Sequence, residues 1–194
     1  MPVLAKFRRQ YPDISLDIQL TDHVSDLTRD QIDIAIRVGV EPQDRVVSRK
    51  LSGNNFVLVA SPAYLYTHGT PLNLAQLSDH RSLYYRGPHA VLYWHANVNG
   101  EWRQLNNKAN IISDHGGGVV KAAVEGDGIA LLPEWGIEKE LSENKLQVIN
   151  LSDAEVVISR ALETGIYILY IKPKYQIQKV KVAVDFLIRE LRTS

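Results

Sequence analysis

The stretch from Ile111 to Pro133, IISDHGGGVVKAAVEGDGIALLP, constrains the fold of this chain most. Its apolar start is broken by three consecutive glycines, after which apolar residues recur at helical spacing. Gly126-Asp127-Gly128 then supplies the backbone freedom that ends a helix, and the apolar run 129–132 is closed by Pro133. The order strand, glycine turn, helix, strand predicts an α/β protein whose helix N-terminus exposes backbone N–H groups to an anion or a carbonyl oxygen.

Composition narrows the class of protein. The 194 residues hold 22 basic and 22 acidic side chains, so net charge does not suggest nucleic acid or an anionic membrane as a direct partner. There is no cysteine, which excludes disulfides and thiolate zinc sites. No signal-peptide-like segment follows Met1, and no apolar run approaches the roughly 20 residues of a membrane helix. We therefore expect a cytoplasmic domain without membrane contact.

The two ends of the chain carry clear periodicity. We expect a helix at Pro2–Gln10, a strand at 14–20, a short helix at 24–30 and a strand at 32–38, with the two strands parallel in a βαβ unit. The last segment, 177–191, has the apolar stripe of an amphipathic helix.

The middle of the chain predicts shorter elements. Strands are expected at 46–47, 56–60, 82–85, 146–151, near Val156 and at 166–171, with helices at 62–66, 72–77 and 133–141. Asn99-Gly100 between aromatic-rich segments predicts a β-hairpin. The apolar strands 56–60 and 166–171 bracket the middle, and we interpret them as crossovers between a lobe of residues 1–60 plus 167–194 and a lobe of residues 61–166. Ligands favour the seam between such lobes.

Four segments in order resemble the effector-binding domain of LysR-type transcriptional regulators. They are FRRQYPDISLDIQLTDHVSDLTRDQIDIAIRVG, FVLVASPAYLYTHGTP, VVKAAVEGDGIALLPEW and KVKVAVDFLIREL. The resemblance implies the fold of type 2 periplasmic binding proteins, with two α/β lobes joined by two crossover strands. It also implies a non-catalytic sensor that binds a small-molecule effector and pairs as a homodimer or tetramer through helices at Pro2–Gln10 and 119–125. The family's N-terminal helix-turn-helix domain and first effector-domain strand are expected to be absent from this chain, so that DNA is bound only through that missing domain.

Candidate effector contacts follow the ends of the expected strands. The glycine turn is the first choice, with a small carboxylate or an aromatic compound as the expected ligand; Asp114 would compete with an anion there, or it would cap the helix. Each candidate also has a structural alternative: the glycines permit a tight turn, Tyr84 fills the core, Arg37 lies on the surface, and Pro133 starts a helix. The full set of candidates is Thr21, Arg37, Ser61, Pro62, Tyr84, Arg86, Ser113, Asp114, Gly116 and Pro133.

Other chemistries have weaker support. The six histidines show no metal-ligand spacing, and neither a GxSxG elbow nor a nucleotide-binding glycine loop is present. We expect no cofactor and no metal. The alternatives that stay open are a stand-alone solute-binding protein and an enzyme on the same fold.

Overall fold

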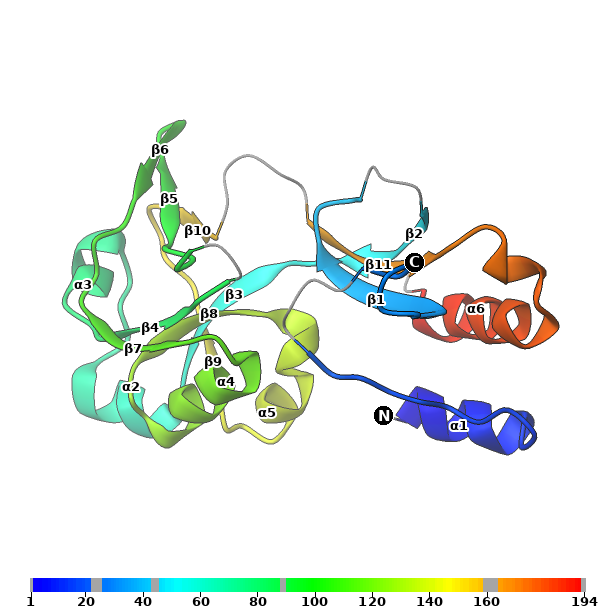
Figure 1. Ribbon diagram of the computed structural model, residues 1–194. Coiled ribbons are helices and arrows are strands. Elements are labelled where there is room, and N and C mark those ends of the chain that lie inside the picture. The colour runs from blue at the N-terminus through cyan, green and yellow to red at the C-terminus, as the bar shows by residue number, and fades with distance from the viewer. Residues whose placement is uncertain (1, 22–25, 43–45, 88–89, 159–163, 193–194) are drawn as a thin grey trace. The chain divides into compact units, whose positions relative to one another are not determined.

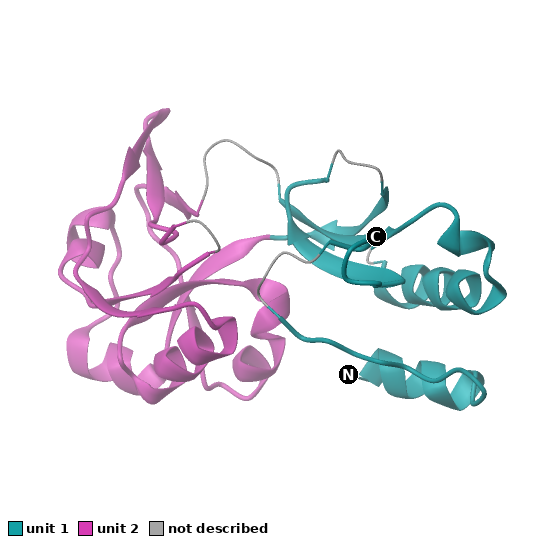
Figure 2. Cartoon of the chain, viewed as in Figure 1, with its two compact units in different colours: residues 1–54, 163–194 teal, residues 55–162 magenta. Residues whose placement is uncertain are grey.

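In the computed structural model the chain divides into two compact units, residues 1–54 with 163–194 and residues 55–162 (Figures 1 and 2). The structure describes residues 2–21, 26–42, 46–87, 90–158 and 164–192. Unit 1 contains both ends of the chain and unit 2 its middle. The expected strand 56–60 belongs to unit 2, because it pairs only with strands of that unit among the described residues.

Unit 2 is built on a mixed sheet with the strand order β7-β4-β8-β3-β9. Three neighbouring strands, β7, β4 and β8, run parallel, whereas β3 is antiparallel to β8 and to β9. The strands are β3 (Phe56–Ala60), β4 (Ser82–Tyr85), β7 (Ala109–Ser113), β8 (Ile129–Pro133) and β9 (Gln147–Ile149). The prediction for 111–133 is confirmed, since β7 leads into α4 (Gly116–Glu125) and α4 into β8.

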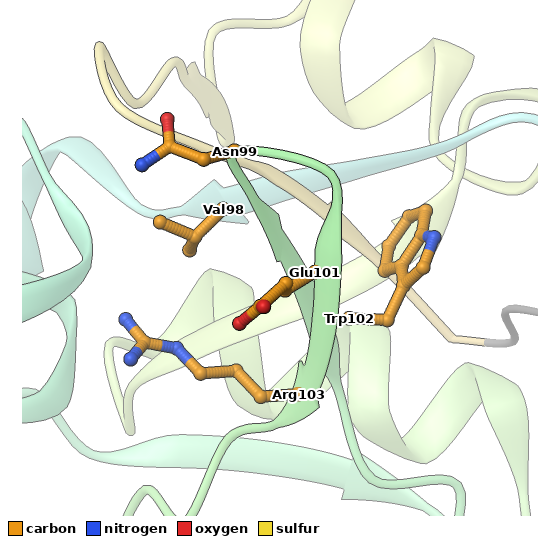
Figure 3. A pocket seen from close by; sticks show the side chains of 5 residues that line it. All are labelled: Val98, Asn99, Glu101, Trp102 and Arg103. Carbon is orange, nitrogen blue, oxygen red and sulfur yellow. The ribbon is translucent and has the colours of Figure 1, made fainter.

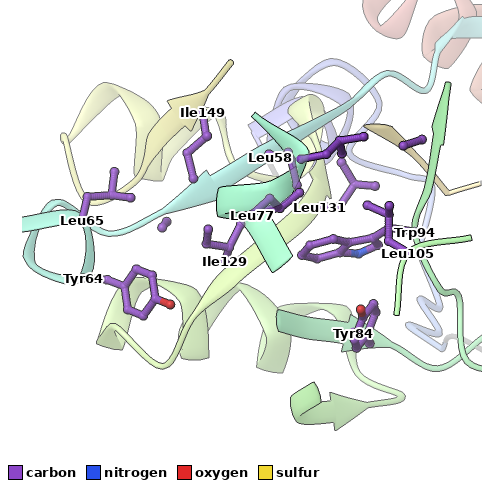
Figure 4. Close-up of a cluster of buried hydrophobic side chains, with 13 residues drawn as sticks. Leu58, Tyr64, Leu65, Leu77, Tyr84, Trp94, Leu105, Ile129, Leu131 and Ile149 are labelled. Atoms are coloured by element: carbon purple, nitrogen blue, oxygen red, sulfur yellow. The ribbon is translucent and has the colours of Figure 1, made fainter. Parts of the chain in front are cut away.

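Helices cover both faces of this sheet. Val119, Ala122 and Ala123 of α4 pack on one face, together with Ile137 and Leu146. The other face is covered by α2 (Pro62–His68) and α3 (Leu74–Ser78), whose Tyr64, Leu65 and Leu77 join the larger core cluster of Figure 4. Burying both faces explains why β3 and β8 read as continuous apolar runs in the sequence.

A small antiparallel sheet with the order β10-β5-β6 completes unit 2. Its strands are β5 (His95–Val98), β6 (Glu101–Gln104) and β10 (Glu155–Val157). Asn99 and Gly100 have φ angles of 54° and 88°, which is the positive-φ pair of a type I′ hairpin turn, so the predicted hairpin is confirmed. Trp94, which directly precedes β5, is 1% exposed and contacts the ring of Tyr84 at a centroid distance of 5.1 Å.

Unit 1 contains an antiparallel sheet with the order β1-β11-β2. The strands are β1 (Ile34–Gly39), β2 (Val47–Gly53) and β11 (Gly165–Tyr170), and the helices are α1 (Pro2–Gln10) and α6 (Gln178–Leu191). Phe7 of α1 packs edge-on against Phe186 of α6 at 5.1 Å, and both side chains are buried. Lys6 and Glu190 join the two helices at their rim through an ion pair of 2.6 Å.

The expected βαβ unit at the start of the chain is wrong. Residues 14–20 form no strand, and β1 is bonded to β11 in antiparallel orientation. Ile14 and Leu16 do pack against the core of unit 1, but Leu20 is 82% exposed. The alternation therefore marks core-facing side chains only in the first half of the segment, and a strand also requires a neighbouring strand to bond with.

Two expected helices also differ from the structure. The segment 133–141 is divided into a 3-10 turn, η1 (Glu134–Gly136), and α5 (Glu138–Ser142). The break is at Ile137, which takes a φ of −132° and is fully buried. The helix expected at 24–30 lies partly outside the described residues, and residues 27–31 form turns in which the Asp26 carboxylate accepts from the Thr28 and Arg29 N–H groups.

Candidate functional site

The carboxyl ends of the parallel strands of unit 2 bring several predicted residues together. Tyr85, at the end of β4, is paired with Ser113, at the end of β7, and the Arg86 N–H donates to the Ser113 carbonyl oxygen at 2.7 Å. Pro133 ends β8, the strand on the other side of β4. Because parallel strands end at one edge of a sheet, this edge is the place where an α/β unit presents groups to a ligand.

The turn between β7 and α4 is held by its own side chains. The Ser113 hydroxyl accepts from the His115 N–H at 3.1 Å and donates to the His115 carbonyl at 3.3 Å. The Nδ1 atom of His115 accepts from the Gly118 N–H at 3.0 Å, so His115 caps α4. The alternative that Asp114 caps the helix is wrong. Asp114 precedes the N-cap residue and is exposed, and its carboxylate does not cap α4.

The three glycines of the turn differ in the space around them. A Cβ added to Gly117 would meet the His115 ring at 3.0 Å, and one added to Gly118 would meet the Ser113 hydroxyl at 3.3 Å. Gly116, in contrast, has nothing within 4 Å of that position. The first turn of α4 carries no acidic residue, so the partial positive charge of the helix N-terminus is not offset by a carboxylate within that turn.

Tyr84 and Arg86 have different environments although both lie near the carboxyl end of β4. Tyr84 is fully buried, and its hydroxyl donates to the Asn107 carbonyl at 3.5 Å. Burial raises the pKa of this phenol, so the hydroxyl stays protonated. Tyr84 thus has the core position that was its structural alternative, whereas Arg86 is exposed at the edge beside Ser113.

Ser61 and Pro62 lie at the opposite end of the sheet from this edge. Because β3 is antiparallel to β8, Phe56 pairs with Pro133 and the chain leaves β3 at the far end. The Ser61 hydroxyl accepts from the Tyr64 N–H at 3.3 Å and caps α2, with Pro62 in the first turn. The structure gives these two residues a role in starting a helix and does not bring them to the Ser113 turn.

The two effector-contact candidates in unit 1 lie on different kinds of segment, one in a strand and one outside any strand. Arg37 is half-buried in β1 and stands opposite Tyr167 of β11. Thr21 is exposed and follows the unpaired segment 14–20. Both stay predictions as effector contacts.

Two residues at the edge were missed by the sequence analysis. His115 was noted only as one of six histidines, although a polar side chain directly before a glycine-started helix is a capping signal. Tyr85 was overlooked next to Tyr84, and alternation along a strand is the signal that distinguishes the two. Among the described residues no cluster of metal-ligating side chains is found, and His23 and His89 lie outside them.

The two α/β units and their sheet orders define a periplasmic-binding-protein-like ligand-binding domain of type 2, which confirms the predicted fold class. A family model described as the LysR substrate binding domain matches residues 1–192, and the chain belongs to this family.

Similar proteins support the same assignment. The transcriptional activator TtdR of Escherichia coli strain K12 is 30% identical over 189 residues, covering 96% of this chain and 58% of TtdR. The full-length structure of the Vibrio cholerae virulence activator AphB has a TM-score of 0.78 at 28% identity and covers 98% of this chain and 62% of AphB. The regulator CrgA of Neisseria meningitidis has a TM-score of 0.84 at 25% identity, with 99% of this chain and 63% of CrgA covered. This chain thus spans about three fifths of the length of these relatives.

No described helix combines the length and the apolar character needed to cross a membrane.

Proposed function

We propose that the chain is the effector-sensing and oligomerisation part of a transcriptional regulator and that its effector docks at the Ser113–Gly116 turn of unit 2. The observation that supports this most directly is the 2.7 Å bond from the Arg86 N–H to the Ser113 carbonyl, which fixes the ends of β4 and β7 beside the start of α4. Arg86, the Ser113 turn and the N-terminus of α4 then lie at one edge of the sheet.

The chemistry of this edge suits a small carboxylate or an aromatic compound that carries an acceptor oxygen. Arg86 supplies a planar pair of donors for a carboxylate, and the helix N-terminus adds a partial positive charge. Exposed Asp114 next to the turn disfavours ligands with several negative charges. Thr21 and Arg37 of unit 1 remain predicted effector contacts.

In the whole regulator, effector binding changes DNA binding only by its differential affinity for two conformations of the domain, a coupling typically of about 1–3 kcal/mol. We propose that α1 and α4 form contacts between copies in a homodimer or tetramer and that DNA is bound by a helix-turn-helix domain outside the matched region. The relatives' names, HTH-type regulators, support that division. Promoter DNA places such a regulator in the cytoplasm.

A thermal-shift screen of small carboxylates and aromatic acids against the chain tests the proposed site. The test variant is Arg86→Ala, which removes the exposed guanidinium at the carboxyl end of β4. Arg81→Ala is the matched control, since this exposed arginine directly precedes the same strand. We expect ligands found with the native chain to lose about tenfold or more in affinity with Arg86→Ala and to keep it with Arg81→Ala. Equal loss or equal retention in both variants removes Arg86 from the site.

The same screen separates a regulator from the alternatives. A solute-binding protein would show the same ligand shift but no ligand-dependent change in operator binding by the whole protein, and an enzyme would convert the ligand. Chromatography of the ligand after incubation, together with an operator-binding assay of the full regulator with and without it, distinguishes the three.

A further inference from the structure

The outer edge of the β5–β6 hairpin is formed by β6, which contains no residue of the proposed effector site. In the sheet β10-β5-β6, strand β5 is central, and β6 has a bonded neighbour on one side only among the described residues. The Leu105 N–H donates to the Trp94 carbonyl, and bonding alternates along an antiparallel strand, so Arg103 and Glu101 also point their backbone groups toward β5. The N–H and C=O groups of Trp102 therefore point outward.

The side chains of β6 have a symmetric pattern about Trp102. Figure 3 shows Glu101 and Arg103 on one side of the strand and Trp102 on the other, around an open hollow that also includes Val98 and Asn99. Across the hairpin, Glu101 is paired with Val98 of β5 and Arg103 with Ala96 of β5. Neither charged residue therefore has an oppositely charged partner on β5. Glu101 and Arg103 are both exposed.

We propose that β6 pairs edge to edge with β6 of a second copy of this chain, antiparallel and centred on Trp102. In this register the outward N–H and C=O of each Trp102 bond to those of the other. Glu101 of one copy then stands opposite Arg103 of the second copy, and the reverse pair forms by symmetry. The two indoles lie opposite each other on the other face. The contact is isologous, as a two-fold axis through Trp102 requires.

The charges also disfavour the neighbouring registers. A pair centred on Glu101 would place two carboxylates opposite each other, and a pair centred on Arg103 would place two guanidinium groups opposite each other. Like charges directly across a strand pair are destabilising, whereas opposite charges and aromatic pairs stabilise it. The order Glu-Trp-Arg therefore favours the Trp102-centred pair over both slipped pairs.

The contact is small, because β6 spans Glu101–Gln104. Stable protein interfaces bury about 1,200–2,000 Å² in total, which so short an edge does not reach alone. We therefore expect weak association that is detectable at high protein concentration and becomes stronger when another contact already holds copies together and raises their effective concentration. This inference does not depend on the proposed effector site.

Disulfide trapping tests the register, because the chain has no cysteine of its own. Trp102→Cys places two thiols opposite each other, and directly opposed residues of a strand pair have Cα separations within the disulfide range. Val148→Cys is the control, since Val148 is 42% exposed on β9, another edge strand, but has no charges of opposite sign on its two sides. We expect the cysteine at 102 to form intermolecular disulfides about five times faster or more than the cysteine at 148 under mild oxidation.

Charge reversals supply the decisive comparison. In the Trp102→Cys background, Glu101→Arg and Arg103→Glu each create like-charge pairs and should slow trapping to the rate of the control. The double reversal restores opposite pairs and should recover the fast rate. Trapping no faster than the control, or a double variant as slow as the single ones, overturns the proposal when the sedimentation measurement below agrees.

The Trp102→Cys variants lack the indole pair of the proposed contact. A sedimentation measurement on chains that retain Trp102 therefore provides an independent test. The native chain, Glu101→Arg and the double reversal are compared at the same high concentration, after circular dichroism shows that each is folded. The single reversal should lower the weight-average sedimentation coefficient and the double reversal should restore it. If all three values agree, the edge does not pair and the proposal is wrong whatever the trapping result.

Discussion

Replacement of Gly128 by alanine should destabilise unit 2 strongly, because this glycine lies against the backbone of Arg81, the residue directly before β4. A Cβ at this position would be 2.5 Å from the carbonyl oxygen of Arg81 and 3.1 Å from its carbonyl carbon. The same carbonyl accepts from the Ile129 N–H at 2.9 Å, directly before Ser82 and Ile129 pair in the parallel strands β4 and β8. The added methyl group can be placed only if this backbone contact opens.

The magnitude follows from the two interactions that are disturbed. Loss of one backbone hydrogen bond costs about 0.5–1.5 kcal/mol, and forcing a methyl group into a packed contact costs about 1–3 kcal/mol. We therefore expect Gly128→Ala to lower the free energy of unfolding by about 2–4 kcal/mol. Gly116→Ala is the matched control, because no heavy atom lies within 4 Å of its added Cβ.

Urea unfolding followed by tryptophan fluorescence measures this change in unit 2 alone. The three tryptophans, Trp94, Trp102 and Trp135, all belong to that unit. Gly116→Ala should stay within about 0.5 kcal/mol of the native chain, since surface changes without contacts have effects of that size. A Gly128→Ala variant that unfolds at the native urea midpoint with an unchanged slope would refute the close approach of β8 to Arg81.

Two further predictions concern the buried cluster around Tyr64, whose hydroxyl bonds to Nδ1 of His80 at 3.1 Å and accepts from the Arg81 N–H at 3.2 Å. Tyr64→Phe removes both partners and should cost about 1–3 kcal/mol in the same urea assay; an unchanged midpoint would contradict these bonds. Burial, followed by repulsion from His68 and partly opposed by Asp79, lowers the pKa of His80 below 6.5. Between the folded-state pKa and 6.5, the folded unit thus binds fewer protons than the unfolded chain. The free energy of unfolding is therefore highest above pH 6.5 and falls as the pH drops from 6.5 toward the folded-state pKa, by at most about 1.4 kcal/mol per pH unit. Urea midpoints between pH 7.5 and 5.5 should show a shallower fall in His80→Gln than in the native chain.

Elements with strong local signals could be predicted from the sequence. Helix α1 matches its predicted range, and β3 and β4 begin and end at the predicted residues. The hairpin follows from Asn99-Gly100, because few residue pairs accept two consecutive positive φ angles. In each case the deciding interaction lies within a few residues of the signal.

Strand partners and strand directions could not be predicted in the same way. The alternation at 14–20 identified core-facing side chains only at Ile14 and Leu16, and a ladder depends on a distant strand. The direction of β3 is set by its pairing with β8 and β9, and this direction decides that Ser61 lies away from Ser113. The predicted effector set therefore included residues from both ends of one sheet.

The candidate site was predictable in its backbone and less so in its side chains. The glycine turn and the helix start were recognised, since glycines after a strand indicate a tight turn. That His115 rather than Asp114 caps the helix depends on side-chain geometry. The burial of Tyr84 depends on Trp94, which comes from another part of the sequence.

Two of the segments that carry the family resemblance meet inside unit 2, at a point away from the candidate site. Ser61 starts α2, and a Cβ added to Gly126, the C-cap of α4, would lie 3.5 Å from the Ser61 hydroxyl. The motif around Ser61 and the glycine stop around Gly126 therefore lie side by side at the same end of the unit. These two segments therefore predict the fold but give no information about the ligand. Effector specificity should then depend on residues at the opposite end, above all Arg86 and Asp114, because these exposed charges lie beside the helix start and are not used to build it.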